Sequence, residues 1–182
     1  TSIYNMVVFS VTEKDKNRKR KCKFMKLGIF MADGCEEIEG LTVVDIVRRA
    51  QMEIEMISIQ KDLNVKGSHD VTFTADTTKE KADFSSYDGI ILPGGMPGTL
   101  YLGADETVQR VIRSFAEEKK LLAAICAAPS VLGEAGLLNG KKATCHPGFE
   151  EKLLGATCLE NPVVVDGNII TSRGMGTAIL FA

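Results

Sequence analysis

The sequence has no tryptophan, only two histidines and five prolines, and no apolar run near the length of a membrane span. A transmembrane helix needs about 20 consecutive apolar residues, so none is predicted. The opening segment TSIYNMVVFSVT lacks the basic flank, longer apolar core and small-residue cleavage site of a signal peptide. We therefore expect a globular protein of the cytoplasm without a membrane partner.

Cysteine is sparse, with five residues, an odd number, and no pair at CxxC spacing. Disulfide-dependent secreted proteins and structural zinc sites both need cysteines at characteristic spacings. The pattern therefore argues against a disulfide framework and against a metal site, and it favours a reducing compartment. The five residues are Cys22, Cys35, Cys126, Cys145 and Cys158.

A large excess of one charge is also lacking, because 22 basic residues face 24 acidic ones. Residues 1–26 hold eight basic and two acidic residues, whereas the remaining 156 hold 14 and 22. This acidic body does not suggest a nucleic-acid partner. The basic run KNRKRKCK (16–23) is interpreted as a solvated tail, with a nucleic-acid or membrane-surface arm as the alternative. We expect residues 1–24 to be a dispensable extension outside the core fold, and residues 25–182 to form the domain.

Short apolar runs alternate with amphipathic helical patterns along the rest of the chain. Strands are predicted at 26–32, 54–59, 88–93 and 121–125, with two or three more within 142–145, 161–167 and 168–172. Helices are predicted over 36–50, 105–119 and 127–138, and a hairpin over 65–76. This alternation is typical of a parallel sheet covered on both faces. Ligands of such folds bind at the carboxyl ends of the strands.

Cys126, in AAICAAPS (123–130), lies where an apolar strand meets a predicted helix. Pro129 suits the first turn of that helix, so the thiol lies beside free backbone N–H groups at the positive end of the dipole. Such a position lowers the pKa of a thiol and favours the reactive thiolate. The arrangement is similar to a nucleophile elbow. The alternative is an inert core thiol, because free cysteine is commonly buried.

Two further segments follow neighbouring strands. The glycines of LPGGMPG (92–98) let backbone amides approach a ligand, and with the amide of Ala127 they could form an oxyanion hole. A tight loop without a ligand is one alternative; phosphate binding is another, although the Lys-Ser/Thr of a P-loop is missing. In DGCEEIEG (33–40), Glu36, Glu37 and Glu39 fill the first turn of a helix, where acids complement the dipole. One carboxyl group near the thiol is a candidate general acid/base, and spacing alone does not say which.

His146, in KATCHPG (142–148), is one of two histidines and the candidate base for a Cys–His pair. The alternative is a ring that only bonds to the nearby backbone. Cys145 and His146 make a weak metal pair, since neighbouring residues seldom coordinate one ion together.

Five segments in order, GCEEIEG, LPGGMPG, AAICAAPS, ATCHP and IITSRGMGTA, resemble the ThiJ/PfpI superfamily, and specifically its parkinsonism-associated protein deglycase (glyoxalase III-like) branch. The resemblance runs from about Met25 to the final residue. It implies a flavodoxin-like (class I glutamine amidotransferase-like) α/β fold, a three-layer sandwich with a mostly parallel central sheet. It also implies a homodimer in which helix 36–50 lies beside the partner.

The resemblance implies roles for individual residues. Cys126 matches the nucleophile, Glu39 the protonated acid that hydrogen-bonds its sulfur, and His146 a nearby histidine. The oxyanion-binding positions match Gly94, Gly95 and Ala127. The positions at the pocket or its rim match Glu36, Arg49, Arg173 and Gly174. No cofactor or metal is implied.

Several positions depart from the family pattern. Ala127 stands where the protease-like branch has a histidine, so peptidase activity is not expected. His69 stands where the deglycase branch often has an arginine near the dimer seam, which implies a weaker anion site there, and Met175 replaces a common proline. The final FA falls inside the family's closing helix, so we expect that helix to be incomplete.

Two functions from different classes remain open. In the first, a cofactor-free enzyme uses the Cys126 thiolate on α-oxoaldehydes such as methylglyoxal, or on their early adducts, while Glu39 moves protons. In the second, an oxidative-stress sensor or redox-regulated chaperone uses oxidation of Cys126. A role in the thiamine pathway (thiazole monophosphate biosynthesis) rests only on an old family name and ranks lowest.

Overall fold

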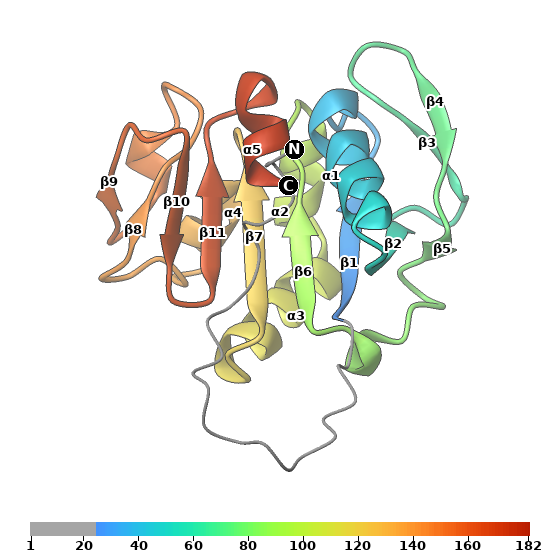
Figure 1. The fold of residues 1–182 in the computed structure, drawn as a ribbon, viewed down its shortest axis with the longest axis horizontal. Helices are drawn as coiled ribbons and strands as arrows, with labels where there is room; N and C mark the ends of the chain where they lie inside the picture. The colour runs from blue at the N-terminus through green and yellow to red at the C-terminus, as the bar shows by residue number, and fades with distance from the viewer. Residues whose placement is uncertain (1–24) are drawn as a thin grey trace, which may run out of the picture.

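A seven-stranded sheet forms the centre of the protein, whose residues 25–182 are described by a computed structural model. The strand order is β10-β11-β7-β6-β1-β2-β5, and within it only the β10–β11 pair is antiparallel (Figure 1). The strands are β1 (Lys26–Met31), β2 (Glu53–Ser58), β5 (Thr77–Thr78), β6 (Gly89–Leu92), β7 (Leu121–Ile125), β10 (Val163–Asp166) and β11 (Ile169–Ser172).

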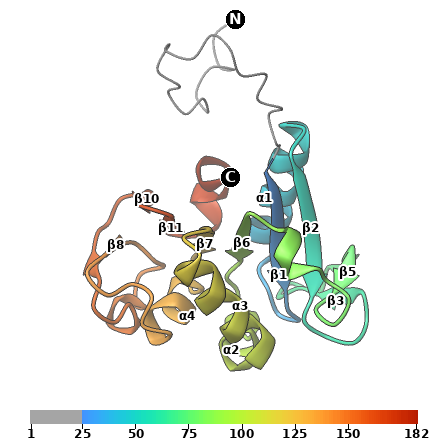
Figure 2. The same ribbon diagram turned by 90° about the horizontal axis from the view of Figure 1, so that it is seen from below.

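Helices cover both faces of this sheet, as the view from below shows (Figure 2). One face carries α1 (Glu37–Arg49) and α5 (Ala178–Phe181); the other carries α2 (Gly98–Ala104), α3 (Glu106–Glu117) and α4 (Pro129–Glu134). The predicted three-layer α/β sandwich with a mostly parallel sheet is therefore confirmed. No helix within residues 25–182 is long and apolar enough to cross a membrane. The predicted extension 1–24 lies outside the described residues.

The two layers of core follow from the alternation of side chains along each strand. Ile29 packs with the α1 side of the sheet, whereas the next residue, Phe30, packs with the side of α2, α3 and α4. Ile91 and Ile90 divide between the same two clusters. Because successive strand residues point to opposite faces, an uninterrupted apolar strand serves both cores. This explains why β6 (GIIL) and β7 (LLAAI) carry no polar side chain.

Two small sheets lie beside the main one. The hairpin predicted over 65–76 is confirmed as β3 (Asn64–Lys66) and β4 (Thr72–Thr74), and β8 (Lys142–Ala143) pairs with β9 (Thr157–Cys158). Short 3₁₀ turns complete the chain, at η1 (Phe84–Ser86), η2 (Glu150–Lys152) and η3 (Met175–Thr177).

Two predicted elements differ from the structure, and one observed helix was not predicted. The strand expected over 142–145 is reduced to β8, which lies outside the main sheet. The helix expected over 127–138 ends at Glu134, and Gly136 then takes a positive φ of 78°, a conformation that ends helices readily. Helix α2 was not predicted, because its sequence GTLYLGA begins with glycine and has no side-chain cap.

Candidate active site

The carboxyl ends of β1, β6, β7 and β11 meet at one edge of the sheet, since these four strands are parallel neighbours. In Figure 1 this is the upper end of the β6, β7 and β11 arrows. The chain after each strand carries predicted site residues, namely 33–39, 93–98, 126–128 and 173–175. The topology thus collects four separate segments around one point.

Cys126 occupies a sharp turn between β7 and α4. Its φ is 65°, which is uncommon for a residue with a side chain and is retained only where the surroundings fix it. Two backbone bonds do so: Cys126 N–H donates to the Ser172 carbonyl at 2.9 Å, and the Cys126 carbonyl accepts from His146 N–H at 2.8 Å. The turn holds the half-buried thiol above the end of the sheet. The predicted strand-to-helix elbow is confirmed.

Glu39 is the acid of the first turn of α1 that lies against this thiol. It is 1% exposed, and its carboxyl group is hydrogen-bonded to the Cys126 side chain. Its Oε2 accepts from Gly94 N–H at 3.0 Å, and the backbone of Met175 also bonds to the carboxyl group. Burial raises the pKa of Glu39 to about 7, with a further increase from the nearby Glu36 carboxylate. A protonated Glu39 is therefore available at neutral pH to donate to sulfur.

The pKa of the Cys126 thiol is raised to about 12, first by burial and then by the charge of Glu39. The prediction of a lowered thiol pKa is wrong in direction. Backbone N–H groups of Ala127 and Gly95 do lower the pKa, but α4 has only six residues and the desolvation of the sulfur is larger. Because the charge of Glu39 contributes to the rise, a thiolate forms at Cys126 most readily while Glu39 keeps its proton.

The paired glycines after β6 are required by close packing. A Cβ on Gly94 would lie 2.5 Å from both Cys126 Cβ and Glu39 Oε2, and one on Gly95 only 2.2 Å from Glu36 N. The backbone N–H groups that bond to the Cys126 sulfur are those of Gly95 and Ala127. The Gly94 N–H already bonds to Glu39, so the predicted oxyanion role of Gly94 is corrected: this amide positions the acid.

His146 lies near the thiol without a hydrogen bond to it among residues 25–182. Its ring Nδ1 is 2.9 Å from the Pro147 carbonyl, and the ring packs edge-on against Phe149 with centroids 6.3 Å apart. A Cβ on Gly174 would lie 3.6 Å from His146 Cδ2, 3.6 Å from Glu39 Oε1 and 3.9 Å from the Cys126 sulfur. Gly174 therefore occupies the point where these three side chains converge.

Of the other predicted rim residues, Glu36 and Arg173 lie at or beside the site, whereas Arg49 does not. Glu36 caps α1, and its Oε2 accepts from Glu39 N–H at 2.7 Å, so Glu36 fixes the start of the helix that carries the acid. Arg173 follows β11 and lines a small cavity of about 120 Å³ beside the site. The prediction that Arg49 lies at the pocket rim is wrong for this chain. Arg49 belongs to the last turn of α1, about 12 residues from Glu37 and so roughly 18 Å along the axis, and it pairs with Asp45 at 2.6 Å.

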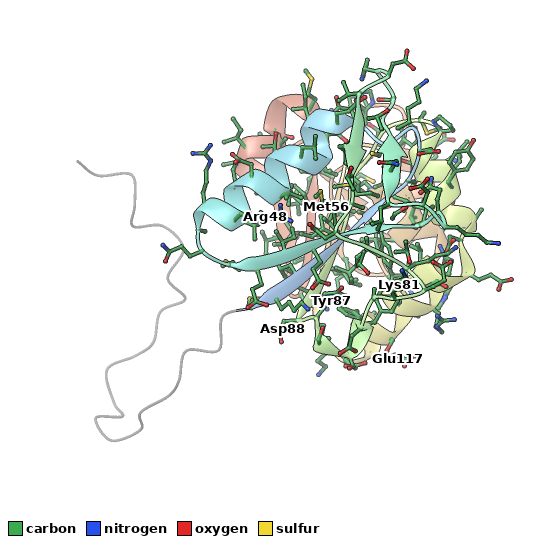
Figure 3. All side chains as sticks on the ribbon, turned by 90° about the vertical axis from the view of Figure 1, so that its right-hand side faces the viewer. Arg48, Met56, Lys81, Tyr87, Asp88 and Glu117 are labelled. Carbon is green, nitrogen blue, oxygen red and sulfur yellow. The ribbon has the colours of Figure 1, made fainter. Side chains whose placement is uncertain are left out.

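The far end of α1 is held by a separate set of contacts. Arg48 pairs with Asp76 at 2.6 Å, and the same carboxyl oxygen accepts from Met56 N–H at 2.8 Å; Figure 3 shows Arg48 and Met56 on neighbouring elements. This end of the helix is remote from Cys126. The resemblance placed Arg49 at the rim by sequence position alone, whereas the length of the helix carries it away.

Glu37 and His69 form a contact that the sequence reasoning missed. Glu37 is 7% exposed, and it accepts from His69 N–H at 2.7 Å and lies 3.0 Å from His69 Nδ1. Burial alone would raise its pKa, but the bonds from His69 lower it to about 2. Glu37 therefore does more than complement the helix dipole: it is a buried acid held by His69. Gly67 is a local sign of this contact in the sequence, because a Cβ at that position would lie 2.3 Å from the Glu37 carboxyl carbon.

One group within residues 25–182 has ligand atoms close enough for a metal ion. Glu36, Glu37 and His69 each offer one such atom, and all three atoms lie within 4.8 Å of one another. The atoms of Glu37 and His69 already bond to each other, and Glu36 caps the helix. The hydrogen bonds described above account for these positions, and the absence of a metal remains a prediction.

Comparisons with known proteins agree with this geometry. The model of the DJ-1/PfpI family matches residues 25–182. The chain is 40% identical over 153 residues to Protein DJ-1 homolog B of Arabidopsis thaliana, covering 84% of this chain but only 35% of that relative's length. It is 36% identical to the glutathione-independent glyoxalase DJ-1 of Schizosaccharomyces pombe, over 86% of this chain and 87% of the relative.

Two further matches extend this set. Identity to the deglycase TK1284 of Thermococcus kodakarensis is 30%, over 84% of this chain and 92% of the relative. Among solved structures, oxidized Toxoplasma gondii DJ-1 superposes with a TM-score of 0.83 at 34% identity, over 86% of each chain. The fold is therefore flavodoxin-like in the manner of these relatives.

Proposed function

The chain belongs to the DJ-1/PfpI family, and we propose that it is a cofactor-free, cysteine-dependent enzyme acting on α-oxoaldehydes such as methylglyoxal and glyoxal, or on their early adducts with proteins. Relatives of similar length are named a glyoxalase and a deglycase. The observation that carries the proposal is the hydrogen-bonded Cys126–Glu39 pair, in which burial raises the pKa of the acid to about 7. A group that titrates near neutral pH can both give and take a proton.

The proposed reaction uses each element of this site. The Cys126 sulfur adds to the aldehyde carbon, and the N–H groups of Gly95 and Ala127 stabilise the developing oxyanion. Glu39 then moves a proton from the former aldehyde carbon to the neighbouring carbonyl group, which converts the hemithioacetal into a thioester of a 2-hydroxy acid. Water attacks the thioester, the C–S bond breaks, and the thiol is regenerated. The reaction is internally redox-neutral.

His146 has a supporting place in this scheme. If its Nδ1 carries the proton that bonds to the Pro147 carbonyl at 2.9 Å, Nε2 is left with a lone pair. We propose that this nitrogen accepts a proton from the water that hydrolyses the thioester. Peptidase activity is not part of the proposal, because Ala127 occupies the position that would have to supply a histidine directly after the nucleophile.

The direct test is consumption of methylglyoxal by the purified chain without glutathione, with lactate as the measured product. We expect turnover in the wild type and none in Cys126→Ala. Turnover in Cys126→Ala equal to wild type would rule out the thiol mechanism. The oxidation state of Cys126 is followed by mass spectrometry in the same samples.

A second candidate function is redox sensing, or a redox-regulated chaperone, through Cys126. The half-buried thiol bonded to a carboxyl group favours it, since a protonated Glu39 could donate to a sulfinate oxygen. A relative of this fold is described as oxidized. A chain that protects client proteins only after Cys126 is oxidised, and that leaves methylglyoxal unchanged, would favour this function.

We also propose that the protein acts in the cytoplasm as a homodimer that uses α1. An open groove of about 490 Å³ between α1 and α5 is lined by Ile38, Leu41, Ile46 and Ile179, and Ile38 and Ile179 are 50% and 77% exposed. Exposed apolar side chains gathered in one groove favour association. Sedimentation at micromolar concentration tests this, and a monomer would contradict it.

A further inference from the structure

A pair of sulfur atoms lies outside the candidate active site, in the lobe formed by β8 and β9. Cys145 and Cys158 both line the cavity of about 120 Å³ that also contains Arg173. In the β8–β9 register Ala143 lies opposite Cys158, and Cys145 is two residues further along the same strand direction. Both thiols line this one cavity, and the charge of Cys158 acts on Cys145, so the two side chains are near neighbours.

Both sulfur atoms contact the same turn. The Cys145 sulfur accepts a hydrogen bond from the backbone of Phe149, and the Cys158 sulfur lies 3.6 Å from the Glu150 carbonyl oxygen. Phe149 and Glu150 are consecutive residues. Their accessibilities differ, since Cys158 is exposed whereas Cys145 is 2% exposed. Cys158 can therefore react with a reagent from solvent, while Cys145 stays shielded in the same cavity.

We propose that Cys145 and Cys158 form an intramolecular disulfide when the protein meets a hydroperoxide, so that this lobe is a redox-sensitive site separate from Cys126. The Cys158 thiolate attacks one peroxide oxygen, the O–O bond breaks, and an alcohol or water leaves. Cys158 is then a sulfenic acid, and its sulfur is attacked by Cys145; the S–O bond breaks and water leaves. Two thiols are oxidised by two electrons, and the peroxide is reduced.

The bridge has a consequence for the neighbouring site. A disulfide needs its two Cα atoms about 4.4–6.8 Å apart, so oxidation ties the Cys145 segment to β9 at a fixed distance. Cys145 is joined directly to His146, whose N–H bonds to the Cys126 carbonyl. The bridge thus constrains the segment that supports the turn of Cys126.

Peptide mapping of the full-length chain tests the proposal. Cleavage after Lys142, Lys152 and Arg173 separates the two thiols into peptides 143–152 and 153–173, each with one cysteine. The chain is treated with one equivalent of hydrogen peroxide, alkylated and digested without reductant. We expect the two peptides to be joined with the loss of two hydrogens, and to separate on treatment with dithiothreitol.

Serine variants provide the controls. Cys158→Ser is an exposed change and should fold; it should abolish the joined peptide and leave Cys145 alkylatable. Cys35→Ser, at a buried thiol that does not line this cavity, and Cys22→Ser should leave the joined peptide unchanged. The proposal is overturned if Cys158 is only over-oxidised, if the bridge joins Cys22 or two chains, or if no bridge forms while Cys126 is oxidised.

Discussion

Two buried carboxyl groups, two residues apart on α1, have pKa values shifted in opposite directions. Glu37 faces the β3–β4 hairpin, where the backbone and ring of His69 bond to it and lower its pKa to about 2. Glu39 faces β7, where its side-chain partner is a thiol, and burial raises its pKa to about 7. Both side chains are under 10% exposed. The bonds from His69 outweigh burial at Glu37, whereas burial prevails at Glu39, so Glu37 is the acid that keeps its charge at neutral pH.

The largest expected effect is that of Glu39→Gln on turnover. Glutamine keeps a hydrogen-bond donor for the Cys126 sulfur but cannot shuttle a proton, so we expect methylglyoxal turnover to fall by about 10²–10⁴-fold. Oxidation of Cys126 should persist in the variant. The measurements are lactate formation and the mass of the intact chain after peroxide.

Glu106→Gln is a matched control, because Glu106 is an exposed acid in the first turn of α3. It should retain full turnover. Wild-type turnover in Glu39→Gln as well would remove the general acid/base role and favour the sensor function.

The pH dependence of stability should distinguish the two acids. The folded pKa of Glu39 is raised from 4.5 to about 7, so its contribution to stability is full below pH 4.5 and is lost as pH rises through 7. Relative to Glu39→Gln, the wild type should lose about 3 kcal/mol of unfolding free energy across this range. Urea titrations at pH 4.5, 6 and 8 measure it.

Glu37 should show the opposite sign. Its folded pKa is lowered from 4.5 to about 2, so its stabilisation is present above pH 4.5 and disappears as pH falls toward 2. The advantage of the wild type over Glu37→Gln should therefore shrink in acid. An advantage that stays constant from pH 6 to 3 would show that the contact with His69 does not depend on charge.

Alanine at two glycines tests the same comparison through packing. In Gly94→Ala the new Cβ would meet Cys126 Cβ at 2.5 Å and the Ile125 carbonyl at 3.0 Å, and we expect a loss of about 1–3 kcal/mol together with turnover. In Gly67→Ala the three nearest atoms all belong to the Glu37 side chain, at 2.3–2.4 Å, so the loss of stability should come through the Glu37–His69 contact while turnover remains. Thermal unfolding and methylglyoxal assays of both variants check this, and equal effects would contradict it.

The smallest effect is expected at His69, which is largely exposed. The Glu37 carboxylate raises the pKa of His69 above 6.5, so the ring should lose its proton at a higher pH than a free histidine does. In Glu37→Gln its pKa should return toward 6.5. Chemical shifts of the ring against pH measure both, and a titration that is the same in the two proteins would show that the contact is absent in solution.

Much of the fold was predictable from local pattern. Residues Ile90, Ile91 and Leu92 are consecutive and apolar, which requires a strand buried on both faces, and such strands alternate with the amphipathic helix at 106–117. Helix α2 escaped prediction because nothing in GTLYLGA marks its start. The end of α4 depended on the positive φ of Gly136, which the letters alone do not distinguish from a helical glycine.

The candidate site was predictable in kind but not in detail. Cys126 stood out because an apolar strand met a proline-led helix, and the order of five motifs singled out Glu39. Sequence could not assign Gly94 to the acid rather than to an oxyanion, since that depends on the direction of one N–H group. Nor could it show that the pKa of Cys126 is raised, because desolvation depends on everything packed around the sulfur.

The alternation of strands and helices follows from the amino-acid sequence alone, and with it the sheet edge where Cys126 and the acids of α1 gather. These follow from side-chain period and from local turns, which act over a few residues. Long-range contacts were needed to show which acid touches the thiol, which one His69 keeps ionised, and that Arg49 lies remote from the site. Those outcomes depend on contacts between residues such as Glu37 and His69, 32 positions apart, which no local pattern contains.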